Sequence, residues 1–231
     1  MKRVVFLAAM AAFGFVGSAN AADMPVKAPM APVVAPYNWT GLYLGVQGGY
    51  AWGSSVQFFT NLGGGSIDRF DINGWVAGGT LGYNWQIQQF VLGIEADYSG
   101  SHINGSGPST ATYNCGAICA TTVTSFGTLR GRLGFTWSNI LIYGTGGLAF
   151  ASIESNLNNG TVTNWRTGWA AGAGVEYGFA PHWSAKLEWI YMAFDSYQWT
   201  NDTNANFACT GLNCSTDAKF SVVRLGLNYR F

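Results

Sequence analysis

Nine ionisable residues lie in segments where apolar residues alternate with small or polar ones. Glu95 and Asp97 stand two positions apart, as do Arg130 and Arg132, and the others are Glu176, Lys186, Glu188, Arg224 and Arg230. Residues two positions apart share one face of a β-strand. These four acids and five bases could neutralise one another in a network of ion pairs, or they could line a narrow water path that selects small ions.

The sequence offers little material for catalysis. It contains two histidines, His102 and His182, and Ser101 precedes the first of them. A catalytic histidine works beside a nucleophile or an acid, but no second acid or nucleophile is arranged around His102. We therefore expect a protein that is not an enzyme and has no cofactor, and we interpret His102 as a loop residue.

The first 21 residues have the features of a secretory signal peptide. Lys2 and Arg3 precede an apolar stretch from 4 to 16, and Ala19 and Ala21 form a small-residue cleavage site. The stretch is shorter than the roughly 20 residues of a membrane-spanning helix, which disfavours an anchor. Residues 22–37 carry four prolines and are expected to form an extended periplasmic leader, followed by one domain over 38–231.

The composition differs from that of an ordinary soluble domain. Charged residues make up only 10% of the chain and aromatic residues 16%, whereas charged residues supply about 25% of a typical soluble domain. The formal net charge is zero and no basic patch is present, so no nucleic-acid partner is expected. No later segment offers 18 consecutive apolar residues, which leaves a soluble secreted β-protein or a barrel in an outer membrane.

Four cysteines occur in two stretches rich in Ser, Thr, Asn and Gly. They are Cys115, Cys119, Cys209 and Cys214. An exported protein meets an oxidising exterior, so disulfides are expected; three pairings are possible, and we favour the local pairs 115 with 119 and 209 with 214. A zinc site is not expected, because neither stretch has the spacing of a metal finger.

Eight segments alternate with the period of a β-strand. They are 39–53, 74–85, 90–99, 122–137, 140–151, 167–179, 183–194 and 219–231. Each reaches the roughly 9 to 11 residues that a tilted strand needs to cross a bilayer. In the last segment, Val223, Leu225, Leu227, Tyr229 and Phe231 alternate with small or polar residues.

The connections between these segments alternate in length. Those at 86–89, 138–139 and 180–182 are short, and those at 54–73, 100–121, 152–166 and 196–218 are long. Short periplasmic turns and long extracellular loops are typical of bacterial outer-membrane barrels. The sequence therefore predicts an all-β fold, an eight-stranded antiparallel transmembrane barrel in the outer membrane of a Gram-negative cell.

The size of such a barrel decides which face meets lipid. Its interior has room only for packed side chains, and the face that carries Trp39, Trp75, Trp85 and other aromatic residues is too bulky for it. The aromatic face must then lie outside against outer-membrane lipids. Its aromatic residues form two belts: Trp85, Phe90, Trp137, Phe179, Trp183, Tyr229 and Phe231 near the short turns, and Tyr50, Trp52, Trp75, Tyr98, Phe150, Trp169 and Tyr191 toward the long loops.

The nine ionisable residues then lie in the lumen. We expect an ion-pair network that plugs the barrel, for example between Glu95 or Asp97 and Arg130 or Arg132 on the next strand. The alternative is a narrow passive channel for small solutes or ions. We favour the plug, because eight strands leave little free bore.

The eight segments also resemble a known family. The motifs "NWTGLYLGVQGGYAWG", "VLGIEADYSGS", "GTLRGRLGF", "HWSAKLEWIYMAF" and the closing "VVRLGLNYRF" are similar to those of the outer-membrane immunogenic proteins of alphaproteobacteria, porin-like surface antigens with an opacity-protein-like barrel. The resemblance runs from Trp39 to Phe231 and includes the signal peptide and the Pro-rich leader.

This resemblance implies a surface-exposed barrel that supports envelope structure and contacts host or surface ligands through its loops. Some members of the family bind haem, but no haem-ligating residue can be matched in this chain. The alternating end of the chain, with Leu227, Tyr229 and Phe231, resembles the signal read by the barrel-assembly machinery, which is then a further partner. We expect a non-enzymatic integral outer-membrane barrel that presents surface loops.

Overall fold

A computed structural model describes residues 37–61, 64–108, 118–157, 160–198 and 213–231. The predicted signal peptide and the predicted leader up to residue 36 lie outside this part of the chain. Its strands are β1 (Gly41–Asn61), β2 (Gly64–Ile87), β3 (Phe90–Pro108), β4 (Ile118–Trp137), β5 (Ile140–Leu157), β6 (Gly160–Ala180), β7 (Trp183–Phe194), β8 (Tyr197–Gln198) and β9 (Asn213–Arg230). No helix in the described ranges is long and apolar enough to cross a membrane.

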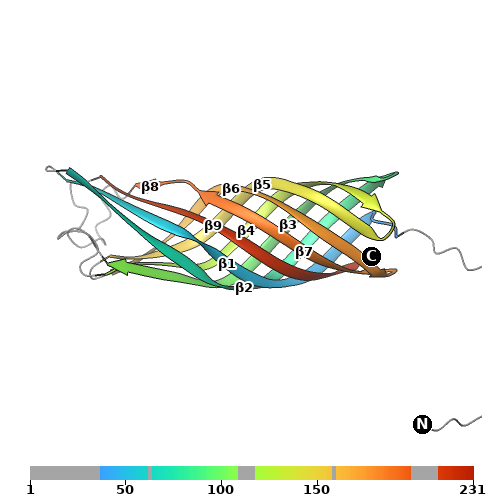
Figure 1. Cartoon of the computed structure of the whole chain (residues 1–231), viewed down its shortest axis with the longest axis horizontal. Coiled ribbons are helices and arrows are strands. Elements are labelled where there is room, and N and C mark those ends of the chain that lie inside the picture. Colours follow the sequence, from blue (N-terminus) through green and yellow to red (C-terminus); the bar gives the residue numbers. More distant parts are fainter. Residues whose placement is uncertain (1–36, 62–63, 109–117, 158–159, 199–212) are drawn as a thin grey trace, which may run out of the picture. The chain divides into compact units, whose positions relative to one another are not determined.

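The strands form one closed antiparallel ring. Consecutive long strands pair with each other, and β1 also pairs with β9 from Tyr43 opposite Arg230 to Thr60 opposite Asn213. Figure 1 shows β1 running beside β9, and the tilted strands of the near wall crossing those of the far wall. Closure leaves no unpaired edge between the first and last strands, which a β-structure in lipid requires. The eight long strands of the described residues confirm the predicted barrel.

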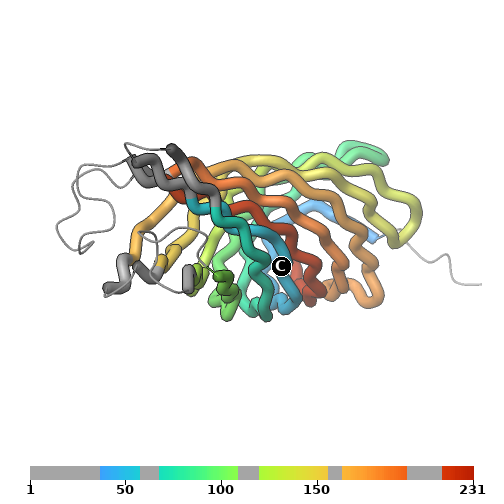
Figure 2. The backbone as a smooth tube through the Cα atoms, turned by 60° about the vertical axis from the view of Figure 1, so that its left-hand side comes forward, coloured from blue at the N-terminus to red at the C-terminus, as the bar shows by residue number. Residues whose placement is uncertain are grey.

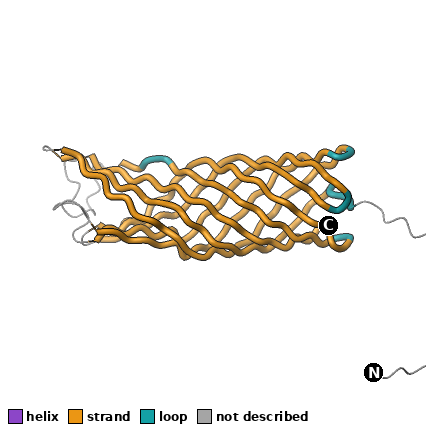
Figure 3. The backbone as a smooth tube through the Cα atoms, viewed as in Figure 1, coloured by secondary structure: helices purple, strands orange, loops and turns teal. Residues whose placement is uncertain are grey.

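Tight turns join the strands at one end of the barrel. Gln88–Gln89, Ser138–Asn139 and Pro181–His182 link the pairs β2–β3, β4–β5 and β6–β7, and Figure 3 shows these turns in teal at the end where the chain terminates. Gln88 and Ser138 have φ values of 57° and 55°. This left-handed backbone lets a two-residue turn follow the twist of its strands.

At the opposite end, the structure corrects the lengths expected for the loops. Most of 54–73, 100–121 and 152–166 is strand, since β1 and β2 continue to Asn61 and Gly64 and β5 and β6 to Leu157 and Gly160. Figure 2 follows these strands past the middle of the barrel toward that end. The extension pairs backbone groups that a loop would leave to water. Ser, Thr and Asn in these stretches had suggested loops, but paired strands with one face in water also accommodate them.

Glycines on the two faces of the wall have different surroundings. A Cβ atom on the inward-facing Gly147 would lie 2.1 Å from the carbonyl oxygen of Leu129, whereas one on the outward-facing Gly146 would lie 3.8 Å from the nearest heavy atom, the carbonyl oxygen of Ala170. Gly147 stands opposite Arg130 on β4. The inward glycine therefore leaves room for the curved wall and for the long side chains that fill the lumen.

These two neighbours make a matched test of lumen packing. Gly147→Ala should lower the free energy of unfolding by roughly 1–3 kcal/mol, the usual cost of overpacking, because its methyl group meets fixed backbone. Gly146→Ala should change it by less than about 0.5 kcal/mol. Urea unfolding in detergent, followed by gel mobility without boiling, measures both. Equal midpoints for the two variants would contradict this account.

Candidate functional site: the packed lumen

The structure brings the ionisable residues together inside the barrel. All nine lie on inward-facing positions, and each is at most 5% exposed. They come from β3, β4, β6, β7 and β9, so the barrel wall surrounds them on all sides. Charges held this far from water are costly unless opposite charges lie beside them.

Arg130 is the centre of the group. Its guanidinium lies 2.6 Å from a carboxylate oxygen of Glu95, 3.0 Å from one of Asp97 and 3.0 Å from one of Glu188. Its Nε donates a hydrogen bond to Thr128 at 2.8 Å, and the Thr128 hydroxyl in turn donates to Asp97. One cation thus joins acids from β3 and β7 across the lumen.

The other bases extend this network. Arg224 lies 3.0 Å from Asp97 and 2.8 Å from Glu188, and the Lys186 ammonium lies 3.1 Å from Glu95. Arg132 pairs with Glu176 on β6, and is 3.9 Å from Glu95 on the neighbouring strand. The sequence favoured neighbouring-strand partners for both arginines, whereas the structure gives Arg132 a partner across the lumen.

Two tyrosines and two neutral side chains complete the polar interior. Tyr43 donates to Glu95 at 2.7 Å, and Tyr143 donates to Glu188 at 3.2 Å. The Arg132 guanidinium also lies over the Tyr143 ring in a cation–π contact, with its central carbon 3.6 Å from the ring centroid. Glu176 accepts from Ser184 at 2.5 Å and from Asn228 at 2.9 Å. The two tyrosines could be anticipated, because each falls on the small-residue face of its segment.

Above the charged layer, the lumen holds a large apolar cluster together with a few buried polar side chains, among them Ser55, Asp68, Thr121 and Arg166. A cluster of 17 buried residues fills the described lumen toward the loop end: Ala51, Phe70, Ile72, Val76, Ile103, Val123, Phe126, Ala149, Ala151, Ile153, Ala170, Ile190, Met192, Phe194, Ala218, Phe220 and Val222. The Phe220 ring lies 5.7 Å from that of Phe126 and 5.5 Å from that of Phe194. The sequence interpretation had assigned small or polar residues to the whole inner face, and the structure shows that this is wrong for the outer half.

Strand β2 shows how the two faces exchange polarity. Near the short turns, Leu81 and Trp85 are exposed on the outer face while Thr80 and Asn84 are buried. Nearer the loops, the exposed residues Arg69, Asp71 and Asn73 are polar and alternate with the buried apolar Phe70 and Ile72, although Asp68 is buried as well. The exchange occurs at Trp75, a residue of the aromatic belt on the loop side.

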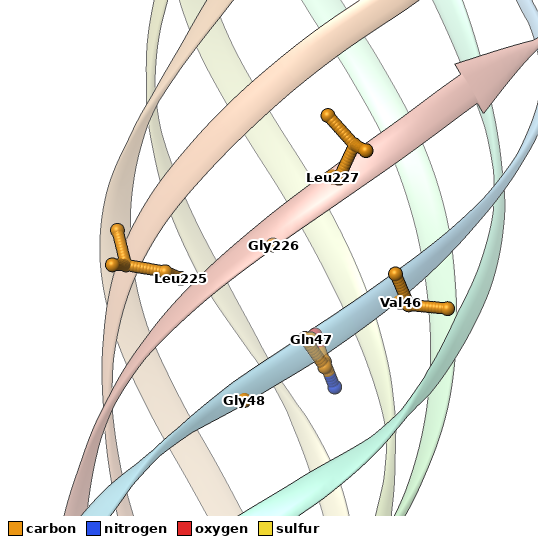
Figure 4. Close-up of a pocket in the computed structure, with 6 residues that line it drawn as sticks. All are labelled: Val46, Gln47, Gly48, Leu225, Gly226 and Leu227. Atoms are coloured by element: carbon orange, nitrogen blue, oxygen red, sulfur yellow. The ribbon is translucent and has the colours of Figure 1, made fainter.

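The outer face between the belts is apolar. Trp75, Trp85, Trp137 and Trp169 are all exposed there, with Trp137 exposing 79% of its surface. At the seam between β1 and β9, the outer face has a hollow of about 390 Å³. Figure 4 shows Val46 and Gly48 of β1 and Leu225, Gly226 and Leu227 of β9 around it. Gly48 leaves the β1 backbone bare on this outer face, so lipid chains can approach the seam closely there, whereas a Cβ atom on Gly226 would point inward and meet the side chain of Lys186.

Trp39 does not belong to this outer face, which corrects the sequence interpretation. It precedes β1, is fully buried, and packs against Tyr37 with ring centroids 4.5 Å apart. Its backbone N–H donates to Gln86 at 2.8 Å. Val91, Leu141 and Tyr143 complete this apolar cluster at the short-turn end. Tyr37, expected in the leader, is therefore part of the closure of the lumen.

Of the remaining candidates for chemistry, His102 lies apart from the lumen. It belongs to β3, not to the loop that the sequence had suggested, and is exposed on the outer face opposite Trp75. Cys115 and Cys209 lie outside the described residues, and for Cys119 and Cys214 the structure describes the backbone alone, so the disulfides remain predictions. Among the described side chains, no group of three His, Cys, Asp or Glu residues is arranged to hold a metal ion.

Removing the central cation tests how much the network contributes. Arg130→Met keeps most of the side-chain volume but leaves Glu95, Asp97 and Glu188 with less positive charge. Breaking a buried ion pair costs about 3–5 kcal/mol, so the urea midpoint of the folded barrel should fall accordingly. Lys219→Met, which removes an exposed cation of β9, is the control and should change stability by less than about 0.5 kcal/mol. Equal losses would show that the lumen charges contribute no more than surface charges.

Comparison with known proteins places the chain in a family. The sequence pattern of the family described as "Outer membrane protein beta-barrel domain" matches residues 8–231. The 31 kDa outer-membrane immunogenic protein of Brucella melitensis is 38% identical over 251 aligned positions, which cover 100% of both chains. The 25 kDa outer-membrane immunogenic protein of Brucella canis is 31% identical over 238 positions, covering 100% of this chain and 99% of the relative.

A solved structure shares the fold. The outer membrane protein OprG from Pseudomonas aeruginosa aligns with a TM-score of 0.51 at 11% identity, covering 84% of this chain and 99% of that one. At this identity the likeness concerns the fold alone. With the family pattern matched over most of the chain and Brucella relatives aligned along its whole length, the resemblance seen in the sequence is confirmed: the chain belongs to the outer-membrane β-barrel family that includes the outer-membrane immunogenic proteins of Brucella.

Proposed function

We propose that this outer-membrane protein is a non-enzymatic barrel that supports the cell envelope and displays the ends of its hairpins outside the cell. The observation that carries the proposal is the exchange of polarity along β2. The outer face is apolar up to Trp75 and polar beyond it, while the inner face changes in the opposite sense. A wall with this pattern matches lipid below the exchange and water above it.

Strand geometry agrees with this placement. Ten residue steps separate Trp75 from Trp85 on β2; at about 3.3 Å per step and a tilt of about 40°, they span roughly 25 Å, the height of the apolar band of an outer-membrane barrel. Nine further steps lead from Trp52 to Asn61 on β1, which carries this hairpin roughly 23 Å beyond the loop-side belt. The hairpins are long enough to be reached from outside the cell.

The filled lumen supports a structural role over transport. Ion pairs close the half near the short turns, and the apolar cluster closes the half near the hairpins. A path for ions would have to pass Phe126 and Phe220, which are at most 1% exposed. Opening such a path would break this aromatic packing. A narrow channel is therefore the weaker candidate.

The partners in this proposal are lipids, the assembly machinery and molecules at the cell surface. Leu227, Tyr229 and Phe231 point outward at the end of β9, where an assembly factor can reach them. The Brucella relatives are named immunogenic, and exposed hairpin ends would offer surface epitopes. We assign no catalytic residue and no cofactor, and we include no nucleic acid among the partners.

Epitope tags test the orientation. A tag inserted at 62–63, between β1 and β2, should be labelled by antibody on intact cells because that hairpin projects outward. A tag inserted at Ser138–Asn139 should be labelled only after the outer membrane is permeabilised. Both variants must first fractionate with the outer membrane and show heat-modifiable gel mobility. Labelling of the second tag on intact cells would reverse the orientation and refute the display of these hairpins.

A conductance measurement separates the structural barrel from the channel. Folded protein in planar bilayers should give no discrete current steps, because the lumen is packed. A general porin reconstituted in the same way confirms that the assay detects pores, and steps that are identical in wild type and Arg130→Gln point to a contaminant. Reproducible wild-type steps that change in amplitude or ion selectivity in Arg130→Gln would establish the channel instead.

A further inference from the structure

The charges of the lumen do not balance at the end near the short turns. Arg130, Arg132, Lys186 and Arg224 each have a carboxylate oxygen within 3.1 Å. For Arg230 the nearest is Oε1 of Glu176 at 4.0 Å, beyond hydrogen-bonding distance. The charged layer holds five bases and four acids, and the buried Arg166 and Asp68 toward the loop end add one of each. One positive charge is therefore in surplus, and Arg230 is the base of the charged layer without a close carboxylate.

None of the three groups near Arg230 that could carry a negative charge neutralises it. Glu176 already pairs with Arg132 and accepts hydrogen bonds from Ser184 and Asn228. Burial raises the pKa of Tyr37 above its ordinary value, so its phenol stays neutral. The α-carboxylate of Phe231 makes no ion pair in the described part of the chain, although the Phe231 amide is fixed by a 3.0 Å hydrogen bond to Leu42.

The guanidinium of Arg230 is held in place with one edge unused. Its Nη1 donates to the carbonyl oxygen of Asn38 at 2.8 Å, and its central carbon lies 5.0 Å and 4.9 Å from the ring centroids of Tyr37 and Trp39. The Arg230 backbone is fixed by His182, whose carbonyl oxygen accepts from the Arg230 N–H at 2.8 Å. Nε and Nη2, although buried, have no acceptor within the described residues.

These two nitrogens form the side edge of the guanidinium fork. Two parallel N–H groups at this spacing match the two oxygens of a carboxylate or a phosphate. The indole Nε1 of Trp39 is a third buried donor without an acceptor in the described structure, and Trp39 is fully buried. Buried donors of this kind are rare unless a ligand, ion or water satisfies them.

We propose that Arg230 and Trp39 form an oxyanion-binding site at the periplasmic mouth of the barrel. The ligand class is a carboxylate or phosphate that approaches the Nε–Nη2 edge of Arg230, with the Trp39 indole as an additional donor. The site lies where residues 37–40, which are not part of any strand, join β1. It therefore links the chain just before the barrel to the closing strand β9, and an anion bound there would strengthen that link.

The test uses the mature chain folded in nonionic detergent, with its Arg Nε–H and Trp Nε1–H resonances followed by NMR. Titration with acetate, and separately with inorganic phosphate, should shift the Arg230 and Trp39 signals saturably. Sodium chloride at equal ionic strength should not reproduce the saturable shift. A second sample in phosphatidylglycerol nanodiscs, without added anion, asks whether a lipid headgroup is the source, since the same shifts would then be present from the start.

Variants decide whether the NMR shifts come from anion binding at the Nε–Nη2 edge of Arg230. Arg230→Gln should abolish the response at Trp39, and Arg230→Lys, which keeps the charge but loses the paired donors, should weaken binding roughly tenfold. Lys219→Gln removes an exposed cation of the same strand and should leave the response unchanged. Heat-modifiable mobility confirms that each variant is folded, and Arg230→Lys remains informative if Arg230→Gln fails to fold.

Two outcomes would overturn the proposal. One is that neither anion, nor the phosphatidylglycerol bilayer, moves the Arg230 and Trp39 signals, as would occur if the Phe231 carboxylate or water already satisfied these donors. The other is an unchanged Trp39 response in folded Arg230→Gln. A response in detergent identifies a free anion, and a response only in phosphatidylglycerol identifies a headgroup phosphate; both support the site.

Discussion

The structure depends on the narrow interior of an eight-stranded ring. Such a ring leaves room for side chains and little else, so each long inward side chain needs a small residue beside it and a partner of matching polarity. Gly147 opposite Arg130 meets the first requirement. The carboxylates around Arg130 meet the second. The filled lumen and the glycine-rich sequence both follow from this constraint.

Closure of the ring also joins the two ends of the domain. Tyr37 and Trp39 enter the mouth of the lumen just before β1, and Arg230 of the last strand contacts both rings. These contacts add to the β1–β9 ladder. A barrel cannot close until its last strand is in place, so contacts between its first and last residues form only at completion. They favour the closed ring over partly assembled sheets.

Much of this could be predicted from the sequence, because the period of two and the size of the barrel together fix which face is outside. The strand extensions could not be predicted, since Ser, Thr and Asn in 54–73 suit a loop and a water-exposed strand equally well.

Three side-chain placements were also missed. Ile190, Met192 and Phe220 were missed as core residues because they alternate with outward residues in segments that are apolar on both faces. The Arg132–Glu176 pair spans the lumen, and strand order alone does not define such cross-lumen contacts. Trp39 was misplaced because the alternation was extended two residues beyond the start of β1.

The change of lumen chemistry along the barrel follows from the solvent outside it. Between the belts the outer solvent is lipid, so moving an apolar side chain from the outer face to the lumen gains little. Charge-assisted hydrogen bonds such as Arg224–Asp97 can hold the strands together there, because the surroundings have a low dielectric constant. In the proposed placement the outside beyond Trp75 is water, so burying Phe70, Ile72 and Phe220 gains the full hydrophobic effect there. With this placement, one ring of strands is stabilised by ion pairs where it meets lipid and by a mainly apolar core where it meets water.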